Sequence, residues 1–210
     1  MKYLRPMKST IRVLRPTLFA SLALAAVAAA FFPIGRSEAG DASIDVTDWV
    51  ARLPTRFTVE GGKSEPTYVE AINIDRRGDV FTAVGGAPAW EDRAVETVNV
   101  DSQGHVTHLV CPSRLRCDNT RPSVSFLSSA WLLAAYRERR YLGRAIPAPY
   151  GARWVICLPA ERIGVTEAVL DPCFDLQTGA VLAQRHRLSG RFDGPSLDPG
   201  SIRISSGGKS

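Results

Sequence analysis

Four cysteines are the side chains in this chain that can take part in the most kinds of reaction: Cys111, Cys117, Cys157 and Cys173. An even number of cysteines favours two disulfides if the chain is exported to an oxidising compartment. Pairing between sequence neighbours, Cys111 with Cys117 and Cys157 with Cys173, is the simplest of three connectivities. The second of these bonds requires residues 160–170 to bulge out of a sheet, so that the two cysteines can face each other.

The three histidines, His105, His108 and His186, do not form a metal-binding pattern. His105 and His108 lie three residues apart in a predicted strand, so their side chains point to opposite faces. They would align with Cys111 only on a helix, which the valine and threonine content of this segment disfavours. We therefore expect both to be surface histidines, and we expect neither a metal nor another cofactor.

Motifs of catalytic residues are missing as well. The sequence has no Gly-x-Ser-x-Gly elbow, no Cys-x-x-Cys pair and no phosphate-binding glycine loop between a strand and a helix. Three acidic residues near Cys173, namely Glu161, Glu167 and Asp171, could form a polar site, although a solvated loop is the simpler interpretation. The sequence therefore predicts no catalytic residue and no enzyme, with an exported hydrolase as the least favoured alternative.

The first 39 residues have the pattern of a secretory signal peptide. Basic residues in Met1–Thr17 precede an apolar segment, Leu18–Phe32, and Ser37-Glu38-Ala39 resembles a cleavage site. The apolar segment would span about 22 Å as a helix, less than the hydrocarbon layer of about 30 Å. We expect cleavage near Ala39, a periplasmic or secreted product and no membrane span after cleavage. An uncleaved membrane anchor is the alternative.

The charge balance argues against a nucleic-acid partner. The chain has 26 basic and 21 acidic residues, but residues 1–39 hold six of the bases and one of the acids. Residues 40–210 therefore carry no net charge and have no overall field to attract a polyanion. This length suits one domain, which we place at residues 40–205, followed by a disordered tail at 206–210.

Period-two patterns predict an antiparallel sheet. Within residues 56–111, short strands are separated by glycine-containing turns, which indicates a meander. Residues 152–188 predict further strands, and the alternation on either side of Thr178-Gly179 indicates a hairpin. A last edge strand is expected at Ser201–Ser205. The expected strands of the meander are Arg56–Glu60, Tyr68–Asp75, Asp79–Val84, Val95–Asp101 and His105–Cys111.

Two helices are expected to pack against this sheet. Residues Asp45–Arg56 carry one apolar stripe, with Asp45 as the N-cap and Pro54 at the end. Residues Ser123–Tyr141 are apolar around most of the helix circumference, so this helix must be largely buried or must cover an apolar ligand. The predicted class is α+β, with a curved antiparallel sheet and one or two helices packed over it.

The order of these features resembles the LolA/LppX-like group of bacterial extracytoplasmic lipoprotein and lipid carriers. A leader, a short amphipathic helix ending in LPTRF, a strand meander, an apolar helix and the segment CFDLQTGAVLAQ follow one another. Members of this group often have an Asp-x-x-Thr-Gly turn before a leucine-containing strand. The resemblance implies a half-barrel, with helices over its concave face, that holds a lipid or acyl chain. By residue type and helix position, the expected ligand-lining residues are Trp49, Val50, Phe126, Trp131 and Leu133.

A second hypothesis requires no small ligand. The chain would then be a non-enzymatic cell-envelope accessory module with a solid core. It would bind a protein partner through a sheet edge or through the basic loop that contains Arg114 and Arg116. A cavity of several hundred Å³ beneath the predicted helix at residues 123–141 would favour the carrier over the accessory module.

Overall fold

The computed structural model describes residues 43–65, 68–86, 94–111, 117, 122, 125–165, 170–192 and 195–207. All of them belong to one unit, Ser37–Ser210. The predicted signal peptide lies outside the described residues, as do Arg114, Arg116 and Glu167. None of the helices that the structure describes combines the length and the hydrophobicity of a membrane span.

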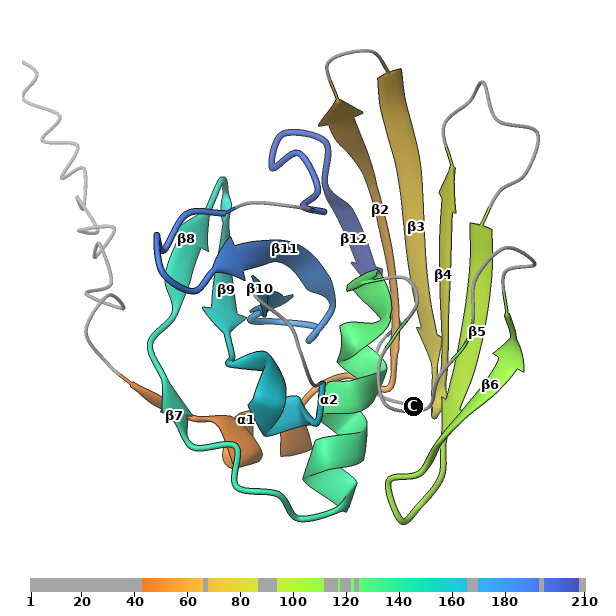
Figure 1. Cartoon of the computed structure of the whole chain (residues 1–210), viewed down its shortest axis with the longest axis vertical. Coiled ribbons are helices and arrows are strands. Elements are labelled where there is room, and N and C mark those ends of the chain that lie inside the picture. The colour runs from red at the N-terminus through yellow and green to blue at the C-terminus, as the bar shows by residue number, and fades with distance from the viewer. Residues whose placement is uncertain are drawn as a thin grey trace, which may run out of the picture. The chain divides into compact units, whose positions relative to one another are not determined.

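The larger layer of the described structure is an antiparallel sheet with the strand order β12-β2-β3-β4-β5-β6, called the large sheet below. It curls into a half-barrel (Figure 1), so the predicted α+β class with a curved antiparallel sheet is confirmed. The predicted meander is confirmed too, although β2 and β3 are longer than expected because they pair along ten residues each. The strands are β2 (Arg56–Glu65), β3 (Tyr68–Arg77), β4 (Val80–Gly86), β5 (Ala94–Val100), β6 (Val106–Val110) and β12 (Arg203–Ser206).

A second antiparallel sheet, called the small sheet, has the order β11-β10-β9-β8 within the described residues. Its strands are β8 (Ala148–Tyr150), β9 (Arg153–Cys157), β10 (Leu170–Asp175) and β11 (Val181–His186). A short pair is formed by β1 (Ile44–Asp45) and β7 (Arg144–Ala145). The edge strand expected near the C-terminus is β12, which begins two residues later than predicted and includes Ser206, the first residue of the predicted tail.

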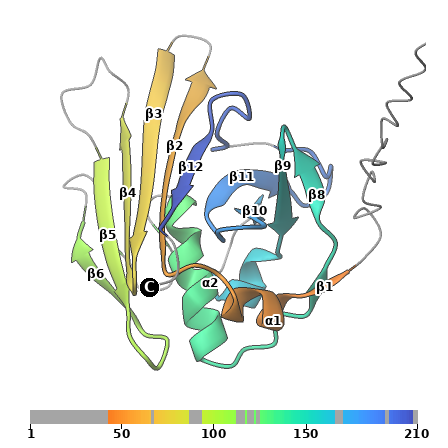
Figure 2. The same cartoon turned by 180° about the vertical axis from the view of Figure 1, so that it is seen from behind.

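One helix lies between the two sheets (Figures 1 and 2). This helix, α2 (Ser128–Arg137), follows a short 3-10 turn, η1 (Ser125–Leu127), and every residue from Ser128 to Ala135 is buried. The buried hydroxyl groups find partners, since Ser128 Oγ donates to Ser125 O at 2.8 Å and Ser129 Oγ accepts the N–H of Val181 at 3.1 Å. A helix that is apolar around most of its circumference is expected to be buried on all sides, and α2 is.

The other helices are short. The first predicted helix is α1 (Val46–Ala51), and Asp45 caps it by accepting the N–H of Asp48 at 3.1 Å, as expected. It is shorter than the predicted 45–56, because the residues after Arg52 lead into β2. A second 3-10 turn, η2 (Ala160–Ile163), follows β9.

The end of α2 differs from the prediction. The helix was expected to continue to Tyr141, but it ends at Arg137 because Arg139 adopts a left-handed conformation with φ = 57°. The N–H of Arg140 donates to Ala135 O at 2.9 Å and that of Arg139 donates to Tyr136 O at 3.1 Å. These two bonds form a Schellman motif, whose left-handed position is usually a glycine. An arginine there gave no stop signal in the sequence.

Both neighbour-paired disulfides are present, and all four cysteines are bonded. Cys157 and Cys173 lie directly opposite each other in β9 and β10. The chain leaves the sheet after β9, with η2 as the first part of the excursion, and returns at Leu170, the first residue of β10 and the last of the predicted excursion 160–170. Two disulfides indicate an oxidising, extracytoplasmic location.

The hairpin between β10 and β11 is held by the carboxylate of Asp175, which is buried. It accepts hydrogen bonds from Thr178 N at 2.9 Å and Thr178 Oγ1 at 2.8 Å, and from Arg153 Nε at 2.7 Å. Gly179 then takes φ = 74°, and a Cβ there would lie 2.5 Å from Leu53 Cδ1. The Asp-x-x-Thr-Gly spacing is therefore explained by two contacts. The Asp175 carboxylate closes the turn by accepting from Thr178, and Gly179 leaves room for Leu53, which follows α1.

Replacing Asp175 by alanine should destabilise the protein by about 3–5 kcal/mol, because the half-buried Arg153 and a buried backbone N–H would lose their acceptor. Urea unfolding followed by far-ultraviolet circular dichroism measures this change. Gln177→Ala, at an exposed position in the same turn, should cost less than about 1 kcal/mol. Equal effects of the two substitutions would show that the carboxylate does not hold the turn.

Replacing Arg139 by glycine should stabilise the protein by about 0.5–1 kcal/mol, because glycine adopts positive φ without the steric cost of a Cβ. Arg139 is exposed, so little packing is lost. Glu138→Gly is the matched control, since Glu138 has helical backbone angles and glycine should weaken that position. A destabilised Arg139→Gly variant in the same urea titration would refute this account of the helix end.

Candidate functional site

Arg137 anchors the C-terminal end of α2 to the large sheet. Its Nη1 donates to the carbonyl oxygens of Val100 and Asp101 at 2.6 and 2.9 Å, and its Nη2 lies 2.5 Å from Asp79 Oδ1. The turn between β5 and β6 packs closely here, since a Cβ on Gly104 would lie 2.6 Å from Ala134 O. The helix end is therefore fixed against two turns of the sheet by charge-assisted hydrogen bonds.

A cleft of about 450 Å³ opens beside this end of α2. Its floor is apolar and comes from α2, β6 and η2, whereas its rim carries charged groups. The cleft is the space left between α2, the 3-10 turn η2 and the turn that leads into β6. The lining residues are Gly104, His105, Val106, Trp131, Ala134, Ala135, Glu138, Arg140, Glu161, Ile163 and Gly164.

Ion pairs hold the charged groups at the rim. Glu138 pairs with Arg140, and Glu161 pairs with Arg187 at 2.6 Å. The pKa of Glu161 lies below its usual range, chiefly because its own backbone N–H donates to the carboxylate and also because Arg187 is near. These pairs give the mouth of the cleft charges of both signs.

Asp171 is not part of a solvated loop, contrary to the simpler interpretation of its sequence context. It lies in β10 and is buried. Its carboxylate accepts from Ala160 N at 3.2 Å and from Arg187 Nη2 at 2.8 Å. The same interaction raises the pKa of Arg187. Asp171 therefore fixes η2, one wall of the cleft, to the small sheet.

The turn at the other wall depends on Asp101. Its carboxylate accepts from His105 Nδ1 at 2.9 Å, from His105 N at 2.9 Å and from Gln103 N at 2.8 Å. These bonds, with that from the His105 side chain the largest, lower the pKa of Asp101 to about 2. The predicted Ser102-Gln103-Gly104 turn is thus held in shape by the residue that precedes it.

The structure separates the five residues predicted to line a ligand site. Trp131 lines the cleft. Trp49 packs against Phe174, with ring centroids 6.4 Å apart, and its Nε1–H donates to Leu176 O at 2.8 Å. Val50, Phe126 and Leu133 are buried in the core and do not line the cleft. Cleft residues that the sequence did not single out, such as Val106 and Ile163, come from elements whose proximity only the fold determines.

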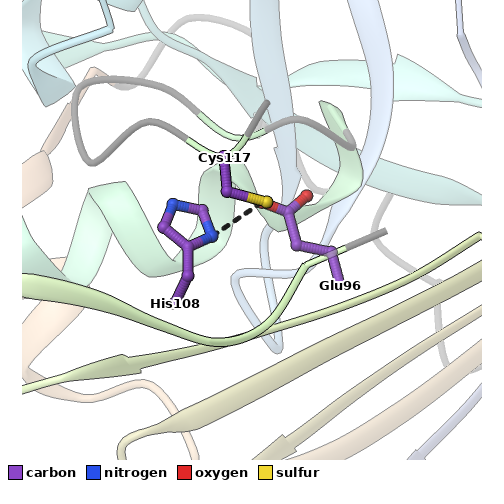
Figure 3. Close-up of side chains that lie close together, drawn as sticks. All are labelled: Glu96, His108 and Cys117. Carbon is purple, nitrogen blue, oxygen red and sulfur yellow. Dashed lines mark ion pairs between the residues drawn. The ribbon is translucent and has the colours of Figure 1, made fainter. Parts of the chain in front are cut away.

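A second group of side chains lies on the inner face of the large sheet (Figure 3). Glu96 on β5 is 0 % exposed, and its Oε1 lies 3.2 Å from Nδ1 of His108 on β6, whose side chain is 10 % exposed. The surface position expected for His108 is therefore wrong. Ligand-type atoms of Glu96, His108 and Cys117 all lie within 4.8 Å of one another.

This group does not have the geometry of a nucleophile relay. Such a relay places the nucleophile and the carboxylate at opposite nitrogens of the imidazole. In Figure 3 the Cys117 sulfur and the Glu96 carboxylate lie on the same side of the His108 ring, toward Nδ1. The sulfur is also bonded to Cys111, so it is not a thiolate. The His108 ring centroid lies 6.2 Å from that of Trp131, which connects this group to the cleft.

The titration of Asp101 gives a test of the turn. Because its folded pKa of about 2 lies below the unfolded value of about 3.9, its contribution to stability is present above pH 4 and is lost as the pH falls toward 2. In His105→Ala, carbon-detected NMR should show the Asp101 midpoint moving upward. An unchanged midpoint would mean that the His105 side chain does not lower this pKa.

Comparison of the chain with protein-family models, with curated proteins and with solved structures found no match. The resemblance to LolA/LppX-like carriers therefore rests on the order of elements and on the Asp175–Gly179 turn. A proposal for the function therefore has to start from the chemistry of the cleft.

Proposed function

We propose that the protein is an extracytoplasmic binding or carrier protein for a lipid or another apolar ligand. The cleft beside α2 carries this proposal, because its volume of about 450 Å³ falls within the usual range of ligand pockets, about 300–1,000 Å³. The disulfides agree with an exported protein. Export by a cleaved signal peptide at residues 1–39, into the periplasm, belongs to the same proposal.

The lining of the cleft favours an amphiphile. Trp131, Ala134, Val106 and Ile163 offer an apolar floor, against which each buried methylene of a ligand would contribute about 0.8 kcal/mol. The rim has carboxylates and guanidinium groups that are already paired with one another. A ligand with an apolar chain and a polar head group suits this division, with the head group near the rim.

Catalysis is not part of the proposal. The rim carboxylates described above are engaged in ion pairs with arginines. Asp171 and Asp175 are buried acceptors that fix turns. These four carboxylates thus have structural partners, which agrees with a carrier.

A second candidate function is the accessory module that binds a protein partner. It is favoured by β6, the terminal strand of the large sheet in the described residues, where Leu109 and Val110 are 57 % and 46 % exposed. Such an edge can accept an added strand from another protein. This candidate makes no use of the cleft, so ligand binding distinguishes it from the carrier.

Mid-chain dibrominated stearic acid should quench the fluorescence of Trp131 in a saturable manner, because bromine quenches an indole that it contacts. Trp131→Phe should remove most of this quenching. Trp154→Phe is the matched control, since Trp154 is 38 % exposed on β9 and does not line the cleft, and it should leave the saturable quenching intact.

A cleft-filling variant tests the position independently. Val106→Phe should weaken binding at least about tenfold, or about 1.4 kcal/mol, by occupying the floor. Val84→Phe is its control. Val84 is half-exposed and its neighbour Ala83 is buried, so the side chain of Val84 lies on the outer face of the large sheet, away from the cleft. Absence of saturable quenching in the wild-type protein, or equal effects of the two variants, would contradict the carrier.

A further inference from the structure

The group formed by Glu96, His108 and Cys117 contains three kinds of metal-binding atom. A carboxylate oxygen, an imidazole nitrogen and a sulfur lie within 4.8 Å of one another. A fourth donor is the sulfur of Cys111, which is bonded to that of Cys117. Carboxylate, imidazole and thiolate are the ligands by which proteins bind Zn²⁺.

One of the three distances is already close to what such a site needs, and the others are at most 4.8 Å. Ligand atoms about 2.0–2.3 Å from a tetrahedral Zn²⁺ are about 3.3–3.8 Å from one another. Glu96 Oε1 and His108 Nδ1 are already 3.2 Å apart. Figure 3 shows that the sulfur approaches from the same side of the imidazole, so one ion could contact all three groups without a turn of the ring.

The disulfide is what keeps the sulfurs from binding a metal ion. Each sulfur shares its electrons in the S–S bond, whereas the metal ligand is a thiolate. A dithiol reductant would transfer two electrons and two protons, converting the bond to the Cys111 and Cys117 thiols while the reductant becomes a disulfide. Binding of one Zn²⁺ by the two sulfurs would then release the two thiol protons.

The two disulfides differ in exposure, so a reductant can reach one before the other. Cys111 is exposed and Cys117 is half-buried. Cys157 and Cys173 are buried, at 7 % and 0 % exposure, between strands of the small sheet. Because thiol–disulfide exchange requires access to a sulfur, the Cys111–Cys117 bond is the one that reacts first.

We infer that Glu96, His108, Cys111 and Cys117 form a redox-dependent site for a zinc-class divalent cation, closed by the disulfide and opened by a dithiol. The buried position of Glu96 and His108 supports this site, because a carboxylate and an imidazole in a dry environment bind a cation strongly. The inference does not depend on ligand binding in the cleft, and it can fail or succeed separately.

The test uses the full chain, reduced gently until alkylation and peptide mapping show free Cys111 and Cys117 with the Cys157–Cys173 bond intact. Zn²⁺ titration followed by native mass spectrometry should give one ion per reduced chain and none on the oxidised chain. Co²⁺ in place of Zn²⁺ should produce a thiolate-to-metal charge-transfer band and the visible bands of a tetrahedral site.

Variants identify the other two ligands. His108→Gln and Glu96→Gln should each weaken Zn²⁺ binding by more than the roughly 10–100-fold that loss of an outer partner costs. His186→Gln, on β11 of the small sheet, should leave the affinity unchanged. If a variant does not fold, alkylation of Cys111 and Cys117 in the folded wild-type chain should still abolish binding.

Three results would overturn the inference. The first is no bound ion on the selectively reduced chain at micromolar Zn²⁺. The second is equal binding to the oxidised chain, which would remove the role of the disulfide. The third is unchanged affinity in both His108→Gln and Glu96→Gln, in which case the two cysteines bind metal without them and the Glu96–His108 pair only supports the sheet.

Discussion

The structure depends on the burial of α2 between two sheets. A helix that is apolar on all sides cannot face water, and here the large sheet and the small sheet each cover part of it. Its buried serine hydroxyl groups are satisfied by η1 and β11, so its polar atoms also depend on the sheets. The large sheet curls on one side of this helix, and the strands of the small sheet complete the enclosure.

The cleft is a consequence of how this enclosure ends. Ser128–Ala135 is buried, but Trp131, Ala134 and Ala135 border the cleft where the helix faces the turn before β6 and the 3-10 turn η2. Asp101 and Asp171 hold those turns in place by hydrogen bonds to backbone N–H groups. The walls of the cleft are thus fixed by polar interactions and its floor by the core, an arrangement suited to a preformed binding site.

Much of the fold could be predicted because its signals are local. The alternation in residues 56–111, the turn at Gly179 and the cap at Asp45 each depend on a few neighbouring residues. The end of α2 could not be predicted, since Arg139 occupies a backbone conformation that favours glycine. The hydrogen bonds that Arg139 N and Arg140 N donate to the last turn of the helix hold that conformation.

The position of His108 was missed for a different reason. Glu96 alternates in phase with Val98 and Val100, the buried residues of β5, and His108 alternates in phase with Val106. An acid and a histidine on the apolar faces of neighbouring strands were therefore a signal for a buried pair. The cleft itself had no such signal, because its lining comes from three elements far apart in the sequence and only Trp131 could be chosen by residue type.

The most direct measurement is native mass spectrometry of the exported protein, purified gently from its own compartment and followed by organic extraction and lipid analysis. The carrier account predicts a population with added mass that corresponds to an extractable amphiphile, and loss of that mass in Val106→Phe. A protein that carries no added mass under these conditions, and that takes up none when offered membrane lipids, would contradict it.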